Sequence, residues 1–232
     1  ARREELQRES ELRAEHSQAL LRLVRDLEQA ENIGMVMDAV HERVVEYLGY
    51  NHSTLCRYPA NETHCARLAI RSSNPILSSL EDGVLFLITG DELMEEIVEG
   101  AETQIVPVAR LEPRIDQAGV EAIGLQSIIR VVTGLSTGTR VVLEFVSIGE
   151  EGVRVPSDIH LEFARGLIAH AGAVVERLEL ARTANRANSA IAGLLDAVGS
   201  HTGQEFFDVL AGNLGKALGV RHVLIAEPSP AD

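Results

Sequence analysis

An apolar periodicity from Pro156 to about Val198 constrains the fold of this chain more than any other stretch. After the proline, Ser157 and Asp158 can satisfy free backbone N–H groups, and the carboxylate suits the positive end of a helix dipole. Apolar side chains then recur at steps of three and four along one face: Phe163, Leu167, Ala171, Val174, Leu178 and Ala181. The pattern predicts one long helix, or two nearly continuous ones, that outruns the preceding core and acts as a connector.

The second half of this predicted helix carries a weaker seam. The seam continues through Ala184, Asn188, Ile191, Leu195 and Val198. Between Leu178 and Ala184 a step of three follows a step of three, as in the stammer of a coiled coil. Asn185 and Asn188 lie near the seam, where they weaken apolar packing and favour a single register. We therefore expect a hinge here, through which a signal passes as a change of helix phase.

Composition narrows the range of partners. The 232 residues carry a formal net charge of −14, whereas a nucleic-acid backbone requires clustered Lys and Arg, so no nucleic-acid partner is expected. No apolar run approaches the roughly 18 residues that span a bilayer, so no membrane contact is expected either. Only two cysteines are present and the charged first residues do not resemble a signal peptide, which together predict a cytoplasmic location.

The first 49 residues predict two helices. Residues 1–30 begin with the favourable i,i+4 pairs Glu4/Arg8 and Glu9/Arg13. They continue with an apolar stripe made of Leu20, Leu23, Val24 and Leu27. Residues 31–49 have one apolar face and a glycine stop at Gly49. We expect residues 1–30 to form a coiled-coil or signalling helix that precedes the domain.

Strand patterns alternate with short helical patterns in the middle of the chain. Strands are predicted at His52–Tyr58, Thr63–Ile70, Thr103–Val108, Ser127–Thr133 and Thr139–Val146. Short helical stretches are predicted near Asp91–Glu99 and over Pro113–Gly124. Two helices, a run of strands interrupted by short helices, and a final long helix predict an α+β domain with a mainly antiparallel sheet.

An internal repeat suggests a second domain. Moving Met37–Arg57 by 170 positions places it on Phe207–Glu227, with matches at Asp208, Leu218-Gly219 and His222 and with the apolar phase preserved. The alternative is that both stretches share only the ordinary order of helix, glycine and strand. A true repeat makes 183–203 a helical linker and 204–232 the start of a second copy, truncated at its first strand.

Three stretches carry the glycine and apolar spacing of a known family. They are Asp82–Gly100 followed by the strand Gln104–Val108, Gly124–Ser127 followed by the hairpin Ile128–Phe145, and Pro156–Asp158 leading to Leu167–His170. In these stretches residues 31–182 resemble a GAF domain, a small sensory module of signalling proteins. A PAS domain is the main alternative, although its usual opening and helix pattern fit less well.

The GAF resemblance implies a five- or six-stranded antiparallel sheet, with the first and last helices on one side and a pocket on the other. It implies a sensory domain of a signal-transduction protein, such as a bacterial sensor histidine kinase of a two-component system or a cyclic-dinucleotide enzyme. GAF domains bind cyclic nucleotides, bilins, haem, iron clusters or small metabolites, or only dimerise. Gly-x-Ser-x-Gly, Walker and Gly-x-Gly-x-x-Gly motifs are absent, so no catalytic residue is predicted and the chain itself is not expected to be an enzyme.

The residues argue against three of these ligands. Asp158 is followed by Ile159, and no Asn-Lys pair precedes it, which departs from the cyclic-nucleotide group. The order His64-Cys65 reverses the Cys-His at which phytochrome-like domains attach bilin. An iron cluster requires more than two cysteines. Haem stays open because the chain has eight histidines, but none shows metal-ligand spacing, so no metal site is predicted.

Cys56 and Cys65 lie on the two strands that flank the predicted turn Pro59–Glu62. A four-residue turn places them opposite each other, with Cβ atoms about 4.5–5.5 Å apart, close to what a disulfide requires. One interpretation is a redox pair, or a metal site shared with His52 or His64. The other is two small buried hydrophobic side chains, the usual role of free cysteines.

The hairpin around Gly134–Gly138 offers a candidate ligand site. If Thr133 faces Thr139, one face is wholly apolar and suits the long helix: Ile129, Val131, Val141, Leu143 and Phe145. The other face is expected to line the pocket and holds Arg130, Val132, Arg140, Val142 and Glu144. In this register Arg130 faces Val142 and lies diagonal to Glu144. Arg130 either anchors an anionic ligand or forms an ion pair with Glu144, because a lone buried charge is very costly.

Two functions follow, a small-molecule sensor and a structural dimerisation module without a physiological ligand. Both predict a parallel homodimer through residues 1–30 and 160–198. The dimer and signalling positions are Leu20, Leu27, Val174, Leu178, Ala181, Asn188 and Leu195. Burying roughly six to eight apolar side chains per protomer, at about 1.5–3 kcal/mol each, would exceed the roughly 4–15 kcal/mol cost of association.

Overall fold

A computed structural model describes residues 2–59, 63–200, 203–218 and 222–225, without the side chains of 194–200, 204, 217 and 218. The chain divides into two compact units, Ala1–Glu176 and Arg177–Asp232. The boundary falls inside α6 (Asp158–Ser200), so the predicted long helix is confirmed and belongs to both units. Among the described residues, no helix combines the length and the apolar character needed to cross a membrane.

The helices at the beginning of the chain form as predicted. α1 spans Arg2–Glu28, and α2 spans Ile33–Arg43. The side chain of Asn32 caps α2 by accepting a hydrogen bond from the Met35 backbone N–H. A π-helical turn, η1 (Val44–Leu48), extends α2 to Gly49, where the chain leaves the helix with a φ of 72° that favours glycine.

Six antiparallel strands form one sheet in the order β3-β2-β1-β6-β5-β4. Their bounds are β1 His52–Tyr58, β2 His64–Ser72, β3 Leu85–Leu87, β4 Thr103–Val106, β5 Leu125–Gly134 and β6 Arg140–Ile148. The five predicted strands and the α+β class are therefore confirmed. Sequence patterns missed the edge strand β3 because three residues are too few to show alternation.

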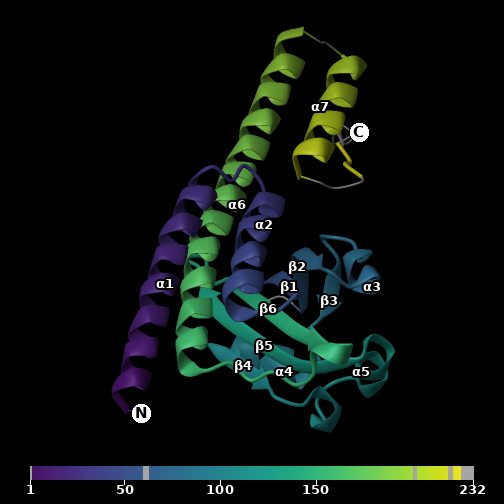
Figure 1. Cartoon of the computed structure of the whole chain (residues 1–232). Coiled ribbons are helices and arrows are strands. Elements are labelled where there is room, and N and C mark those ends of the chain that lie inside the picture. Colours follow the sequence, from purple (N-terminus) through teal and green to yellow (C-terminus); the bar gives the residue numbers. More distant parts are fainter. Residues whose placement is uncertain (1, 60–62, 201–202, 219–221, 226–232) are drawn as a thin grey trace. The chain divides into compact units, whose positions relative to one another are not determined.

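Short helices accompany the sheet. They are α3 (Pro75–Ser78), α4 (Glu92–Glu99), α5 (Gln117–Ile123) and the 3₁₀ turns η2 (Ala109–Leu111) and η3 (Gly149–Glu151). The carboxylates of Asp91 and Asp116 cap α4 and α5 by accepting backbone N–H groups. Figure 1 shows α1, α2 and the first part of α6 together on one side of the sheet, while α4 and α5 lie away from them.

The side of the sheet under α1, α2 and α6 holds the main core. Ile129, Val131, Val141, Leu143 and Phe145 have no exposed surface, and we call them the helix-side face. The opposite surface of β5 and β6, with Arg130, Val132, Val142 and Glu144, is called the α4-side face. The prediction that the helix-side face is wholly apolar is confirmed.

α1 and the first part of α6 pack against each other within the protomer. The ring of His16 stacks on Phe163 with centroids 4.3 Å apart, and Arg13 lies 3.7 Å from Glu162. Gly166 admits Leu20, because a Cβ at Gly166 would lie 2.8 Å from a Leu20 methyl carbon. Of the predicted dimer positions, Leu27 is buried inside the chain, and so are Phe163, Leu167 and Ala171 at the beginning of the apolar periodicity of α6.

The second unit contains the rest of α6 and α7 (Gln204–Leu218). Asn213 Nδ2 donates a hydrogen bond of 2.9 Å to the Gly193 carbonyl, which joins the two helices. α7 coincides with the helix that the repeat predicts, since α2 and η1 end at Leu48 and α7 ends 170 positions later at Leu218. Residues 222–225, where the repeat predicts a strand, have no regular structure, and the rest of that stretch lies outside the described residues.

Candidate functional site

The strand register brings Arg130 and Glu144 directly opposite each other. β5 and β6 pair Gly134 with Arg140 and Arg130 with Glu144, so the predicted pairing of Arg130 with Val142 is wrong by two residues. The connection Leu135–Thr139 has the five residues predicted but lies one position later in the chain, and inside it the Leu135 N–H donates to the Thr139 carbonyl. A slip of two residues preserves the faces, since side chains alternate with a period of two.

Arg130 and Glu144 form an ion pair on the α4-side face. Arg130 Nε donates to Glu144 Oε2 at 2.6 Å, and the side chains are 11% and 25% exposed. Burial opposes the charge on Arg130, but its neighbours, Glu144 foremost, together favour that charge and raise the pKa of the guanidinium. The two side chains therefore form the ion pair that was the alternative to an anchor for an anionic ligand.

Gln104 links this ion pair to α4. Arg130 Nη1 donates to Gln104 Oε1 at 3.4 Å, and the Gln104 amide donates to the Leu93 carbonyl and to Glu96 Oε2, both at 2.8 Å. Gln104 is itself buried on β4. A movement of the Arg130 side chain can therefore be transmitted to α4 through the Gln104 side chain.

Apolar side chains surround the ion pair. Val132 and Val142, both expected to line the pocket, pack in one cluster with Tyr58, Cys65, Ile88, Ile97, Cys56, Phe86 and Met94. Burial raises the pKa of Tyr58, so its hydroxyl stays protonated near neutral pH. The arrangement offers hydrogen-bond donors and acceptors at one point in an apolar surrounding, which is the usual composition of a small-molecule site.

Cys56 and Cys65 do not face each other. Cys56 pairs with Arg67, so the predicted pairing of Cys56 with Cys65 is wrong by two residues. The last pair before the turn, Arg57 with Ala66, encloses two more residues than predicted, and the bulge between Leu55 and Cys56 lies farther from the turn than this pair. Both cysteines are free, and burial raises the pKa of both thiols. Protonated, buried thiols suit the apolar role better than redox chemistry. Within the described part of the chain, no group of three or more His, Cys, Asp or Glu side chains could hold a metal ion.

The predicted signalling positions fall into two groups. In the first unit, Leu27 is buried, while Leu20 and Val174 are half-buried. In the second unit, Leu178 is half-buried, whereas Ala181 and Asn188 are exposed. The side chain of Leu195 lies outside the described residues. The side chains of Ala181 and Asn188 are therefore available for contact with another chain, and the side chain of Leu27 is not.

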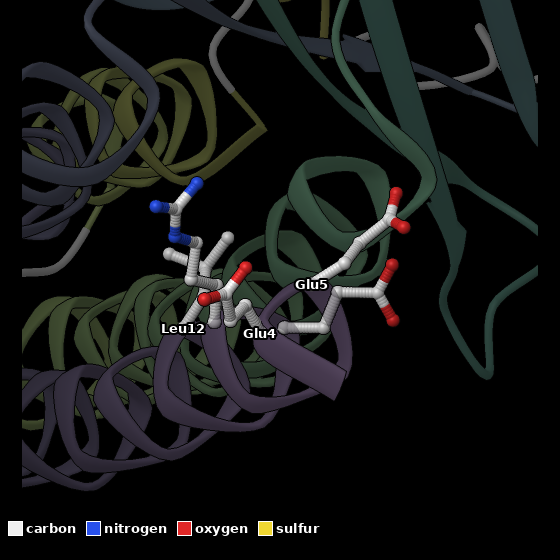
Figure 2. A pocket seen from close by; sticks show the side chains of 5 residues that line it. Glu4, Glu5 and Leu12 are labelled. Carbon is white, nitrogen blue, oxygen red and sulfur yellow. The ribbon is translucent and has the colours of Figure 1, made fainter. Parts of the chain in front are cut away.

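Among the hollows on the first unit, two are lined by described residues. One, of about 380 Å³, is lined by Glu4, Glu5, Arg8, Glu9 and Leu12, which all belong to one face of α1 (Figure 2). Because a single helix supplies every lining residue, this hollow is open surface. The other, of about 350 Å³, lies between the end of η1, the segment Val153–Pro156 and His160 of α6. Sequence reasoning missed it because no motif marks these three distant segments.

Solved structures with this arrangement of sheet and helices are GAF domains. The GAF domain of a phosphoenolpyruvate-protein phosphotransferase from Coxiella burnetii has a TM-score of 0.59 at 13% identity, over 72% of this chain and 96% of its own. The phytochrome photosensory core module of Stigmatella aurantiaca has a TM-score of 0.57 at 15% identity, over 89% and 46%. Free methionine-R-sulfoxide reductase from Neisseria meningitidis, in complex with its substrate, has 0.56 at 11% identity, over 73% and 93%.

These comparisons establish the fold. No protein-family model matches the sequence, and no curated protein matches it either. With identities this low, the structural likeness concerns the fold alone, and on that basis the chain has the fold of a GAF domain, as its motifs predicted.

Proposed function

We propose that residues 31–182 are a non-catalytic sensory domain of a signal-transduction protein, which binds a small molecule at the Arg130–Glu144 pair and transmits its state through α6. The GAF fold supports a sensory role, because structures with the same fold include a phytochrome photosensory module. It supports the binding of a small molecule, because another structure with this fold is a reductase in complex with its substrate. The buried thiols and the absence of a catalytic motif in the sequence support a role without chemistry.

The observation that carries the proposal is the ion pair in the apolar cluster. Burying two charges is costly, and apolar replacements of a buried pair are often neutral or stabilising, so such a pair is weakly explained by stability alone. Gln104 links the pair to α4, the helix that covers this face. A ligand that opens the pair has to satisfy both a guanidinium and a carboxylate. The ligand is therefore zwitterionic, or neutral and polar.

β4 supplies a route from this site to α6. Gln104 and Thr103 are neighbours in a strand, so their side chains project to opposite faces of the sheet. Gln104 contacts Arg130, while the Thr103 hydroxyl accepts hydrogen bonds from Arg165 of α6 at 3.2 and 3.1 Å. A ligand that moves Gln104 thus displaces the strand that holds Arg165.

Native mass spectrometry of the protein purified from cells tests the proposal, followed by thermal shifts with amino acids and other small metabolites. We expect a retained or added small molecule that is lost in the double variant Arg130→Met/Glu144→Leu. The exposed pair Glu9 and Arg13, replaced in the same way, is the matched control and should leave binding unchanged. A clean apo mass together with no thermal shift for any compound would refute the ligand site and favour a scaffold.

The second candidate function is dimerisation without a ligand. Large apolar side chains remain exposed on each helix: Leu6 and Leu21 on α1, and Leu180 and Ile191 on α6. We propose that these helices join two protomers in a parallel homodimer, with Ala181 and Asn188 near the contact. Light scattering at micromolar concentration checks it, and a monomer would contradict it. Asn188→Leu should tighten the dimer by removing a polar group from the seam.

A further inference from the structure

A second cleft lies where α6 begins, on a different surface from the Arg130–Glu144 pair. Its walls are Leu48 and Tyr50 around the end of η1, the extended segment Val153–Pro156, and His160 in the first turns of α6. The ring of Tyr50 packs edge-on against Phe145 at 4.8 Å, and Phe145 belongs to the helix-side face. The walls of the cleft are therefore in contact with the main core through Tyr50 and include the start of α6 through His160.

The charge of this cleft is opposite to that of the chain. Arg154 gives it a positive charge, and none of the described residues that line it carries a carboxylate, although acidic residues outnumber basic ones by 35 to 21 in the chain. Arg154 is held in place, since its guanidinium lies 5.7 Å from the centre of the Tyr50 ring and donates to the Gly49 carbonyl. That bond uses one of the five N–H donors of the guanidinium, which leaves donors for a ligand.

Apolar surface adjoins the guanidinium of Arg154 in this cleft. Val153 and Val155 are 49% and 61% exposed, and Leu48 completes the wall. We propose that the cleft binds a small organic anion, a carboxylate carrying a short apolar or aromatic body. The carboxylate accepts from Arg154 in the paired geometry that guanidinium and carboxylate favour, and the apolar body covers the two valines.

Occupancy of the cleft would act on α6 directly. His160 lies in the first turns of α6, and its Nδ1 lies 3.0 Å from the Ser157 hydroxyl. Leu48 is the last residue of η1, and π-helical turns occur frequently at functional sites. A ligand between them joins the end of η1 to the beginning of α6. This site is independent of the proposed site under α4, because different residues on another surface form it.

Titration with benzoate, followed by ¹H–¹⁵N NMR of the whole chain, tests the proposal, with benzamide as the uncharged probe of the same shape. We expect benzoate to shift the amides of residues 48–50 and 153–160, and benzamide to shift them much less. Arg154→Gln should weaken benzoate binding by about tenfold or more, while Arg110→Gln, which removes an exposed charge elsewhere, should not. The free-state spectrum of each variant reports whether it is folded.

Three results would overturn the proposal: no shifts with millimolar benzoate, equal shifts with benzamide, or unchanged affinity in folded Arg154→Gln. If Arg154→Gln does not fold, Arg154→Lys replaces it, and unchanged benzoate affinity there together with equal benzamide shifts has the same meaning. Benzoate binding should persist in Arg130→Met/Glu144→Leu, so failure of one proposed site leaves the other intact.

Discussion

The two faces of the central sheet are filled in different ways. The helix-side face presents only apolar side chains with no exposed surface to α1, α2 and α6. The polar side chains of Ser53, Ser127 and Ser147 on that side of the sheet are small, buried and hydrogen-bonded. The α4-side face holds an ion pair, a buried amide and two thiols among its apolar residues. One side is therefore filled mainly by close apolar packing, and the other includes a pair of opposite charges.

The largest effect is expected on the helix-side face. Phe145→Ala removes a fully buried ring and should lower the free energy of unfolding by about 3–5 kcal/mol, measured by urea denaturation. Phe86→Ala is the matched control on the other face, where the ring is half-buried and lies 5.2 Å from the Arg67 guanidinium. Equal losses in the two variants would mean that both faces contribute alike to stability.

The next effect separates charge from packing on the α4-side face. Glu144→Leu leaves Arg130 buried without its partner and should cost about 3 kcal/mol, since breaking a buried pair is strongly destabilising. The low end of the range applies because Glu144 keeps 25% of its side chain exposed. The double variant Arg130→Met/Glu144→Leu should recover most of this loss in the same urea experiment. A double variant as unstable as the single one would show that the pair itself stabilises the fold.

His16 is a polar exception on the helix side of the sheet. It is 5% exposed, and its Nε2 atom is buried without a hydrogen-bond partner among the described residues. His16→Phe keeps the stacking on Phe163 and should raise the free energy of unfolding by about 1–2 kcal/mol at pH 7.5, because an unsatisfied buried polar atom is removed. Urea denaturation measures the gain, and a loss of stability would mean that the imidazole makes a contribution that packing does not replace.

The same variant tests a pH dependence. Burial, and then the neighbouring His160, lower the pKa of His16, while Glu15 acts in the opposite direction. The unfolded state therefore binds more protons than the folded state as the pH falls below about 6.5, so stability decreases there. Between pH 7.5 and 5.5 the loss should be smaller in His16→Phe than in the unchanged protein. Some loss should remain, since the pKa values of His41, His52 and His160 are also lowered by burial. Identical slopes would exclude His16 as a source.

The smallest expected change concerns the thiols of the α4-side face. Because burial raises the pKa values of Cys56 and Cys65, alkylation by iodoacetamide at pH 8 should be at least about tenfold slower in the folded protein than in urea. Mass spectrometry follows the modification without altering the fold. Rapid labelling of either cysteine in the folded state would restore a chemical role for this face.

Prediction from sequence succeeded where the signal is local. The strands β1, β5 and β6 follow from side-chain alternation, and the end of the second helix at Gly49 follows from its glycine stop. It failed for β3, because this strand depends on hydrogen bonds between residues far apart in the chain. The Arg67 N–H donates to the Val84 carbonyl, and the Ile88 N–H donates to the Thr63 carbonyl. The Arg130–Glu144 contact was anticipated as an alternative, but the register that produces it was not.

The sequence alone determined which residues share a face. Alternation in β5 and β6 survives a slip of two residues, so the apolar and polar sets of the hairpin were separated correctly even with the wrong register. The periodicity of the α6 segment likewise predicted helical structure throughout this stretch, as one helix or two nearly continuous ones, and the structure has the single helix α6 from Asp158 to Ser200.

Only the tertiary structure decided which side chains are in contact with one another on those faces. A connection between β1 and β2 two residues longer than predicted separated the two cysteines, and the loop closed by Leu135 and Thr139 aligned Arg130 with Glu144. Packing inside the protomer buried Leu167 and Phe163, on which His16 of α1 stacks. The approach of Arg154 to Gly49 formed the cleft at the start of α6. Such contacts depend on strand register and on segments distant in the chain, which local propensity and periodicity do not encode.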